Sequence, residues 1–407
     1  MARAMKDSGV YWVATIPENW HVAQLKRYAS VNNGQEIGLE IDKNDNAIPV
    51  YGSGGVFKFT DTYMFNGKAV MFGRKGTLGK PIYVSGKFWT VDTMYYLTYS
   101  DKLDAKFNFY QLLAFDWIPH ITQTALPSIV GSEIAACKFA FPPVQEQSRI
   151  VSFLDSACAR IDAVMEQTRA SIEEYKKLKQ SIITEAVTKG IRPNRPMKDS
   201  GIEWIGHIPE DWTVYRIANL YDERNESGDE DLPILTVSIN TGISDHEVAD
   251  EEQSRVFVRS EDRTKYKRVY PGDLAYNMMR AWQGAFGAVR VDGMVSPAYV
   301  VARPKQGISL DSRYMEALLR TPAAIEEMHR YSRGITDFRL RLYCPEFKNI
   351  SVCIPSYQEQ KEIADYIDTK NTEIDALIAK KEQFLSELET YKKSLIFEYV
   401  TGKKEVV

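Results

Sequence analysis

The chain contains one unit written twice. Residues 5–29 (MKDSGVYWVATIPENWHVAQLKRYA) return at 197–221 as MKDSGIEWIGHIPEDWTVYRIANLY. A second segment, QEQSRIVSFLDSACARIDAVMEQ at 145–167, returns at 358–380 as QEQKEIADYIDTKNTEIDALIAK. Each copy is far longer than the roughly 20–50 residues of a solenoid repeat. The duplication therefore predicts two pseudo-equivalent domains related by a pseudo-twofold axis, and such a molecule suits a partner with two related sites.

Each copy ends in a segment with the pattern of a long amphipathic helix. Apolar residues recur there mostly at steps of three and four, which places them on one helix face. They are Ile150, Leu154, Ala157, Ile161, Val164, Ile172, Tyr175 and Ile182 in the first copy, and Ile363, Ile367, Ile374, Leu377, Leu388, Tyr391 and Leu395 in the second. Gly190 and Gly402 follow these segments, as glycine commonly follows a helix. We expect two helices of about 40 residues, or roughly 60 Å, that pair antiparallel because neither apolar face can stay in water.

The segments before these helices have the composition of mixed α/β bodies. Short runs of β-branched and aromatic residues punctuated by glycine are typical of strands. These runs are 68–72, 81–84 and 89–99 in the first body, and 273–276, 287–291 and 298–301 in the second. Segments 107–117 and 312–328 are expected to be short helices, and Trp20 and Trp212 to be matching core anchors. The predicted fold class is α+β.

Composition and motifs favour a non-catalytic protein. The four cysteines form no CxxC pair and the five histidines are scattered, so neither a disulfide framework nor a metal site is expected. There is no GxxxxGK[ST], no GxGxxG at a strand end and no HExxH. The run Gly52-Ser-Gly-Gly55 lacks the lysine of a phosphate loop, and we interpret it as a turn. No apolar run of 18 residues occurs. We expect a cytoplasmic protein without a cofactor and without a membrane partner.

Charge is segregated along the chain, although the net charge is only −4. Residues 222–252 contain eleven acidic side chains against one basic side chain, Arg224. Residues 255–350 contain 17 Arg or Lys against 10 acidic residues, and residues 56–141 contain 9 against 6. Two mildly basic bodies therefore lie within an acidic chain. Nucleic acid remains a candidate partner for these bodies despite the overall balance.

The first candidate binding segments follow a predicted strand in each body. Gly73–Lys80 (GRKGTLGK) and Met279–Gly284 (MRAWQG) mix cations with amides, hydroxyls and glycine. Arg and Lys pair with guanine, Gln pairs with adenine, and Thr or backbone amides suit phosphate. The candidate residues are Arg74, Lys75, Thr77 and Lys80 in the first body, and Arg280, Trp282 and Gln283 in the second. The alternative is a glycine-rich turn with solvated cations.

The second candidate segments precede the prolines at the helix starts. Residues 333–341 (RGITDFRLR) align without gaps to 120–128 (HITQTALPS). Arg339 and Arg341 alternate with Phe338, Leu340 and Leu342, which places both arginines on one side of an extended segment. The counterparts of these two arginines are Leu126 and Ser128, so the segment varies as a specificity determinant would. The candidates are Gln123, Thr124 and Ser128 in the first body, and Arg333, Thr336, Arg339 and Arg341 in the second. A solvated strand edge is the alternative.

These motifs resemble the specificity subunit of a type I restriction–modification system. The resemblance is carried by MKDSGIEWIGHIPEDW with its N-terminal echo, by the helix starts PPVQEQSRIVSFLD and IPSYQEQKEIADYID, and by GRKGTLGKPIYV with GDLAYNMMRAWQGAFG. It covers essentially the whole chain. The helix-entry motif and the duplicated layout are its most specific parts.

The resemblance implies two α/β target-recognition domains in pseudo-twofold arrangement, separated by two long antiparallel coiled-coil helices. The expected divisions are a first target-recognition domain at 1–144, a first helix and linker at 145–196, a second target-recognition domain at 197–357 and a second helix at 358–407. The domains would read a bipartite target in double-stranded DNA. Two methyltransferase (modification) subunits and the motor–nuclease (restriction) subunits would be the protein partners, and would bind the methyl donor and ATP.

The residues alone leave a second hypothesis open. In it the chain is a non-catalytic coiled-coil scaffold whose two repeated bodies bind protein partners. Retention on heparin or DNA, with and without a methyltransferase partner, separates the two hypotheses.

Overall fold

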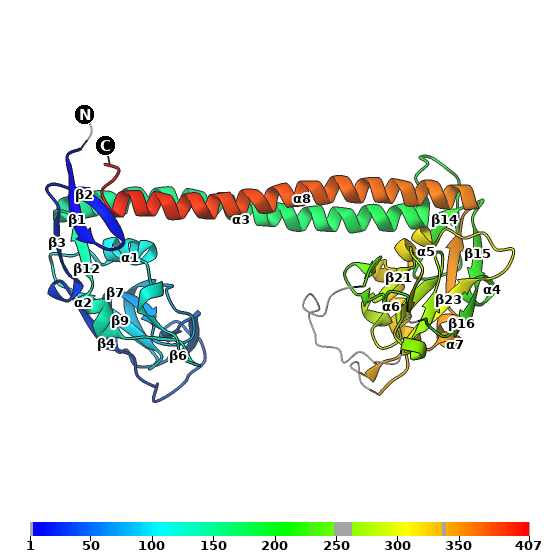
Figure 1. Ribbon diagram of the computed structural model, residues 1–407, viewed down its shortest axis with the longest axis horizontal. Helices are drawn as coiled ribbons and strands as arrows, with labels where there is room; N and C mark the ends of the chain where they lie inside the picture. The colour runs from blue at the N-terminus through cyan, green and yellow to red at the C-terminus, as the bar shows by residue number, and fades with distance from the viewer. Residues whose placement is uncertain (1–2, 230, 248–262, 336–338, 407) are drawn as a thin grey trace. The chain divides into compact units, whose positions relative to one another are not determined.

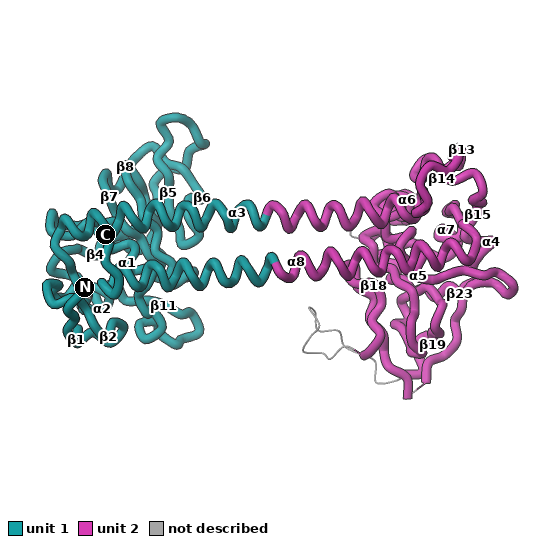
Figure 2. Tube along the Cα trace, turned by 90° about the horizontal axis from the view of Figure 1, so that it is seen from above, with its two compact units in different colours: residues 1–169, 381–407 teal, residues 170–380 magenta. Residues whose placement is uncertain are grey.

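The computed structural model describes residues 3–229, 231–247, 263–335 and 339–406, and the chain divides into two compact units. Unit 1 combines residues 1–169 with 381–407, and unit 2 is residues 170–380 (Figure 2). Each unit therefore contains part of both long helices. The domain boundaries expected from the sequence, at 144/145, 196/197 and 357/358, instead assigned each long helix to a single segment.

The two long helices are α3 (Val144–Lys189, 46 residues) and α8 (Tyr357–Val400, 44 residues). Both are a little longer than the sequence pattern predicted. Each is followed by a glycine in the left-handed region, Gly190 at φ 75° and Gly402 at φ 71°. This conformation favours glycine because it has no Cβ, and it ends the helix.

A buried glutamine explains the repeated QEQ motif at the helix starts. The Nε2 group of Gln147 donates to the carbonyl of Pro142 over 3.0 Å, and Gln360 does the same to Pro355. The Oε1 atoms of the two glutamines accept from the backbone N–H of Asp104 (2.8 Å) and Asp311 (2.9 Å). Each glutamine thus joins the proline turn to the start of a short helix in its own unit.

Within each unit the α3 and α8 segments run antiparallel. In unit 1, Asp162 pairs with Lys392 over 2.7 Å and Arg169 pairs with Glu389 over 3.4 Å. In unit 2, Lys179 pairs with Asp375 (2.7 Å) and Arg192 with Glu362 (2.9 Å). Residue numbers rise along α3 as they fall along α8. Exposed ion pairs contribute only about 0–1 kcal/mol, so apolar packing of the helices into the two cores supplies most of the stability.

Unit 1 is built on a six-stranded sheet with the order β4-β9-β7-β8-β5-β6, antiparallel except for the β5–β8 pair. Its strands are β4 (Ala29–Asn33), β5 (Ile48–Gly52), β6 (Gly55–Thr60), β7 (Phe65–Gly73), β8 (Ile82–Thr90) and β9 (Met94–Tyr99). The small paired strands are β1 (Met5–Val10) with β2 (Val13–Pro17), β3 (His21–Gln24) with β12 (Lys138–Phe141), and β10 (Ile121–Thr122) with β11 (Ser128–Ile129). The short helices are η1 (Leu25–Arg27), α1 (Ala105–Ala114), η2 (Ile118–His120) and α2 (Gly131–Ala136).

Unit 2 has a smaller sheet of four antiparallel strands in the order β16-β23-β20-β21. These are β16 (Tyr221–Arg224), β20 (Leu274–Asn277), β21 (Phe286–Ala288) and β23 (Tyr299–Pro304). The pairs beside it are β13 (Met197–Asp199) with β14 (His207–Pro209), β15 (Thr213–Arg216) with β24 (Ser351–Ile354), β17 (Val237–Ser238) with β18 (Gly242–Ile243), and β19 (Lys267–Val269) with β22 (Gly293–Val295). The short helices are α4 (Ile217–Leu220), η4 (Arg263–Lys265), η5 (Ala281–Gln283), α5 (Ser312–Leu319), α6 (Pro322–Tyr331) and α7 (Cys344–Phe347).

Two sequence expectations need correction in detail. The helix expected over 312–328 is two helices, because Thr321 caps a new helix whose first residue is Pro322. The strand expected over 89–99 is the end of β8, a turn and β9. Part of the acidic segment 222–252 is also structural: Asp222 lies in β16, and Glu226 pairs with Arg303 over 2.8 Å.

The two leaders form equivalent anchors at the helix ends. Trp20 and Trp212 are buried, at 1% and 0% exposure, as their matching positions predicted. The guanidinium of Arg3 lies 5.6 Å from the ring centre of Trp20, and that of Arg195 lies 5.9 Å from Trp212. In Figure 1 the strands β4, β7 and β9 of unit 1 lie below the long helices, whereas the leader strands β1 and β2 lie beside the C-terminal end of α8. The leader and the helices thus support a sheet whose loops are free to vary.

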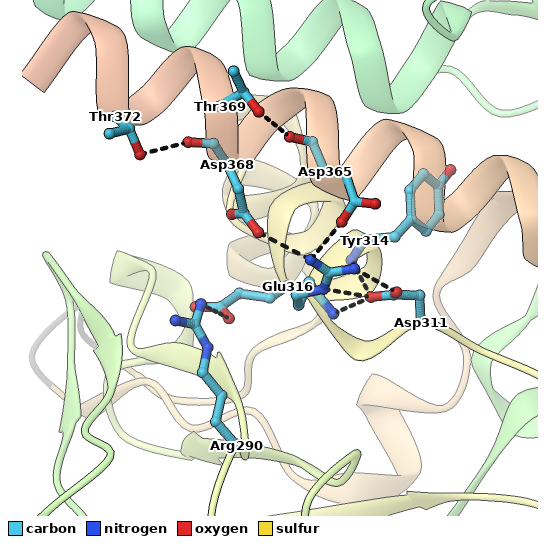
Figure 3. Close-up of polar contacts among 9 residues, drawn as sticks. Arg290, Asp311, Tyr314, Glu316, Asp365, Asp368, Thr369 and Thr372 are labelled. Atoms are coloured by element: carbon cyan, nitrogen blue, oxygen red, sulfur yellow. Dashed lines mark hydrogen bonds and ion pairs between the residues drawn. The ribbon is translucent and has the colours of Figure 1, made fainter.

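The short helix that follows each main sheet is also tied to a long helix by charge. In unit 1, Lys106 of α1 pairs with Asp155 of α3 over 2.7 Å. In unit 2 the guanidinium of Arg313 pairs with Asp311, Asp365 and Asp368 at 3.1, 2.8 and 3.1 Å. Figure 3 shows these three labelled carboxylates directed toward one guanidinium group. The hydrogen bond to Asp311 also raises the pKa of Arg313, so the cation stays charged.

Candidate nucleic-acid interface

The loop after β7 presents the first set of candidate residues. The backbone N–H groups of Arg74 and Lys75 donate to the carbonyl of Thr93, over 2.8 and 3.3 Å, which fixes the start of the loop. The side chains of Arg74, Lys75 and Lys80 are exposed, whereas Thr77 is partly buried. Backbone anchoring with exposed cations is an arrangement that can meet a phosphate backbone.

The hairpin β10–β11 presents the second set in unit 1. Thr122 and Ser128 pair across it, with their hydroxyl oxygens 2.9 Å apart. Gln123 and Thr124 lie in the exposed turn, where the Thr124 hydroxyl donates to the carbonyl of Leu126 over 2.9 Å. The Gln123 amide is therefore the group in this turn with the chemistry to pair with a base edge.

Two backbone contacts bring the loop and the hairpin together. Lys75 and Ser128 form an antiparallel bridge, and the N–H of Ile129 donates to the carbonyl of Arg74 over 3.0 Å. The candidate residues of unit 1 come from segments about fifty positions apart in the sequence. The structure brings both segments together at the C-terminal end of β7, an interior strand of the main sheet.

In unit 2 the post-strand segment is a tight turn around η5. Gln283 is exposed, whereas Arg280 and Trp282 are partly buried. The indole Nε1 of Trp282 donates to the carbonyl of Met279 over 3.0 Å, and its ring lies 5.5 Å from that of His329. Trp282 therefore has a packing role inside unit 2, which the prediction of a DNA contact did not include.

The second candidate segment of unit 2 turns back on itself. Arg333 and Arg341 exchange two backbone hydrogen bonds of 2.9 Å. Arg339 and Arg341 are exposed, while Leu340 (8%) and Leu342 (0%) are buried. The predicted alternation of arginine outside and leucine inside is confirmed for 339–342. Thr336 and Phe338 lie outside the described residues.

Arg333 differs from Arg341 in having an acidic partner. Its guanidinium forms an ion pair with Glu346 over 2.5 Å, although most of the side chain remains exposed. The acid partner holds the guanidinium against α7 and neutralises part of its charge. Arg333 is thus a weaker candidate for a DNA contact than Arg341.

The same backbone contact recurs in unit 2. The N–H of Leu342 donates to the carbonyl of Met278 over 2.8 Å, as Ile129 does to Arg74 in unit 1. A hollow of about 610 Å³ lies at this junction and contains the three arginines but not Arg280, Trp282 or Gln283. Its lining residues are Met279, Arg333, Gly334, Ile335, Arg339, Leu340, Arg341 and Tyr343.

Sequence reasoning did not single out three large exposed side chains of this hollow, Met279, Ile335 and Tyr343. Met279 is 44% exposed and Tyr343 is 41% exposed. The alternation that placed Arg339 and Arg341 outside continues to position 343, so the pattern already contained the signal for Tyr343. Met279 had no such signal, because a methionine after a strand is more often part of the core.

The part of the chain that the structure describes shows neither a cluster of metal ligands nor a membrane-spanning helix. Among these residues no three His, Cys, Asp or Glu side chains gather as metal ligands. No helix within the described ranges is long and apolar enough to cross a membrane. Burial raises the pKa of the thiols of Cys137 (to about 11), Cys344 (to about 12) and Cys353 (to about 12).

Comparisons with known proteins agree on one family. A model described as the type I restriction modification DNA specificity domain matches residues 17–174. The type I restriction enzyme MjaVIII specificity subunit of Methanocaldococcus jannaschii is 24% identical, with 96% of this chain and 94% of the relative covered. The EcoBI specificity subunit of Escherichia coli is 22% identical, with 64% of this chain and 57% of the relative covered.

Among solved structures, a chain from a study of complex assembly and conformational transition in a type I R-M system is similar in fold. Its TM-score is 0.67 at 13% identity, with 96% of this chain and 99% of that chain covered. At this level of identity the likeness shows the fold alone.

Proposed function

The chain belongs to the family of type I restriction–modification specificity subunits, and we propose that its two units read the two halves of a bipartite DNA target. Such a subunit recognises DNA and is not itself the catalyst. The proposal assigns one half-site to the loops of unit 1 and the other to the loops of unit 2.

One observation carries this assignment. In both units the same backbone hydrogen bond holds a variable segment against the loop that follows the central strand: Ile129 to Arg74, and Leu342 to Met278. The frame is shared, but the exposed side chains on it differ between the units. A shared frame with different contact residues is what a protein needs to bind two different sequences in the same manner.

The chemistry of the two surfaces favours different bases. In unit 2, Arg341 and Arg339 are suited to the O6 and N7 acceptors of guanine in the major groove. In unit 1, Gln123 is suited to adenine, and the cations Arg74, Lys75 and Lys80 to phosphate. We assign phosphate or base contacts also to Thr77, Thr124 and Ser128, to Arg280 and Gln283, and to Thr336.

The long helices are proposed to pair as an antiparallel coiled coil that separates two target-recognition domains in pseudo-twofold arrangement. Support comes from the antiparallel ion pairs inside each unit, Asp162 with Lys392 and Lys179 with Asp375. The number of unread base pairs between the half-sites would then follow from helix length. We further propose that two methyltransferase subunits and the motor–nuclease subunits bind this chain, and that those partners bind the methyl donor and ATP.

Methylation-sensitive sequencing tests the function directly. The chain would be expressed with its own methyltransferase subunits in a host that lacks other modification enzymes. We expect modified bases in a motif of two short half-sites with a constant spacer, and none when the chain is omitted. An unchanged methylome, or a contiguous motif, contradicts the proposal. A complex that forms but shows no sequence preference favours the scaffold hypothesis.

The spacer hypothesis has a separate test. Seven residues would be inserted after Arg169 in α3 and seven after Lys380 in α8, which keeps the antiparallel register. The added length of about 10.5 Å corresponds to about three base pairs at roughly 3.4 Å each. Selection from a library of spacers should return the same half-sites about three base pairs farther apart. An insertion variant that folds and keeps the original spacer contradicts the hypothesis.

A further inference from the structure

The turn of the β5–β6 hairpin lies beside the candidate loops of unit 1. β5 and β6 are joined by a two-residue turn, Ser53-Gly54, with Gly52 opposite Gly55. A Cβ atom added to Gly76, in the middle of the loop after β7, would lie 3.0 Å from the hydroxyl of Ser53. The turn and the cationic loop therefore lie next to each other, with little space for a side chain at position 76.

The base of this hairpin is fixed to the turn between β8 and β9, which also holds the loop after β7. The Thr90 hydroxyl donates to the carbonyl of Tyr51 over 2.9 Å, and the N–H of Val91 donates to it over 3.3 Å. Thr93, in the same β8–β9 turn, accepts from the N–H groups of Arg74 and Lys75. One short turn thus positions both the hairpin and the cationic loop.

The hydrogen-bond donors at the tip of the hairpin have no acceptor within the described part of the chain. Within the described residues, no hydrogen bond is formed by the Ser53 hydroxyl or by the backbone N–H groups of Ser53 and Gly54. Gly54 is exposed, and a Cβ atom added there would meet no atom within 4 Å. Free N–H and hydroxyl donors on an exposed glycine turn can approach an anion closely, as in many phosphate contacts.

The corresponding region of unit 2 is arranged differently. There the β17–β18 hairpin packs on β21, since a Cβ atom added to Gly287 would lie 2.5 Å from the N atom of Ile243. The turn carbonyls of Ile239 and Asn240 accept from the guanidinium of Arg320, over 2.9 and 2.7 Å. The carbonyls of this turn already accept hydrogen bonds within unit 2. In the turn of unit 1, by contrast, the Ser53 hydroxyl and the N–H groups of Ser53 and Gly54 have no acceptor among the described residues.

We propose that the Ser53-Gly54 turn is a third DNA-binding element of unit 1, which binds a phosphate of the duplex next to the bases read by residues 74–80 and 121–129. The inference rests on the proposed function and adds a contact that the β17–β18 turn, in the described part of unit 2, does not offer. Because the ligand is a phosphate, the turn contributes affinity without sequence preference. The first half-site would accordingly be held by a more extensive backbone contact than the second.

Three substitutions at one open position test the charge requirement. The full-length chain would be assembled with its methyltransferase subunits, and binding to the cognate duplex measured over a range of salt concentrations. Gly54→Asp should weaken binding roughly three- to tenfold. Gly54→Lys should strengthen binding and raise the number of counterions released, read from the slope of log K against log salt concentration, by about one. Gly54→Asn, which matches Asp in size without its charge, is the control and should bind nearly as the parent does.

A neutral methylphosphonate placed at successive positions of the duplex locates the contact. At one position beside the first half-site, the difference between the Asp and Lys variants should disappear. If all three variants bind alike to the cognate duplex, or if Gly54→Asp alters base preference, the turn does not bind phosphate and the inference is wrong. If the parent complex itself shows no target preference, the proposed function fails, and this inference fails with it.

Discussion

The candidate DNA-binding segments of the two units differ in charge while sharing one backbone contact. The turn of unit 1 presents uncharged groups, Gln123 and Thr124, and the segment of unit 2 presents Arg339 and Arg341. The hydrogen bonds from Ile129 and Leu342 depend on backbone atoms alone and are therefore insensitive to side chains. The main chain therefore sets the position of each segment, so the exposed side chains can differ between the units without disturbing this backbone contact.

The anchors of the two units can be compared by deleting the buried indoles. Trp212→Ala and Trp20→Ala should each destabilise by about 3–5 kcal/mol, because a large cavity replaces a fully buried ring. The loss should fall on the unit that contains the substitution. Hydrogen exchange resolved by unit is the measurement, since a two-unit chain need not unfold in one step. Equal loss of protection in both units would contradict their independence.

The helix ends should respond unequally to the same substitution. Both Gly190→Ala and Gly402→Ala place a Cβ in the left-handed region, at a cost of about 1–3 kcal/mol. At Gly402 the new atom would also overlap the ring of Pro17, whereas at Gly190 the nearest atom is the flexible guanidinium end of Arg195 at 2.9 Å. Gly402→Ala should therefore cost more. Urea unfolding of the two variants reports the difference, and a larger loss at Gly190 would contradict it.

Arg341→Ala tests the assignment of half-sites. Loss of a bidentate contact to guanine should reduce discrimination at one position of the second half-site by about 1–3 kcal/mol. Preference in the first half-site should stay unchanged, because its contact residues lie in unit 1. Selection from randomised targets measures both halves in one experiment. Ser128→Ala, at the matching position of unit 1, is the control. It should change preference in the first half-site and leave the second half-site unchanged. Uniform weakening for every sequence would instead identify Arg341 as a phosphate contact.

The smallest effect is expected at the ion pairs that join a short helix to a long helix within each unit. Arg313→Lys gives unit 2 the residue type that unit 1 uses at Lys106. A lysine cannot keep the forked contacts to Asp311, Asp365 and Asp368 together, so we expect a loss of about 1 kcal/mol. Lys106→Arg, which has one carboxylate partner, should change little. Thermal unfolding of both variants gives the comparison, and equal shifts would contradict it.

Periodic features of the sequence predicted the fold well. The long helices follow from apolar steps of three and four, because helix geometry repeats along the whole segment. Trp20 and Trp212 follow from their matched positions. Breaks were harder to predict: the stop between α5 and α6 depends on Thr321 capping a helix that starts at Pro322. The division of each long helix between two units is a long-range property that no local pattern contains.

The candidate site was predicted in part, for a similar reason. Alternation over 339–342 placed the arginines outside because burial follows strand geometry. The meeting of Lys75 with Ser128, and of Ser53 with Gly76, depends on chain segments far apart in sequence. The ion pair between Arg333 and Glu346 also depends on a residue thirteen positions away in another element.

The composition of unit 1 has a consequence for biosynthesis. Its core contains Leu395, Ile396 and Val400, which come from α8 and leave the ribosome after all of unit 2. Domains fold as units while the chain is being made. Unit 2 can therefore complete its core first, although the leader of unit 1 is translated earlier. Until residues 381–406 emerge, the apolar face around Ile150 and Leu154 lacks part of its cover, and a nascent chain stalled at that stage would be a substrate for chaperones.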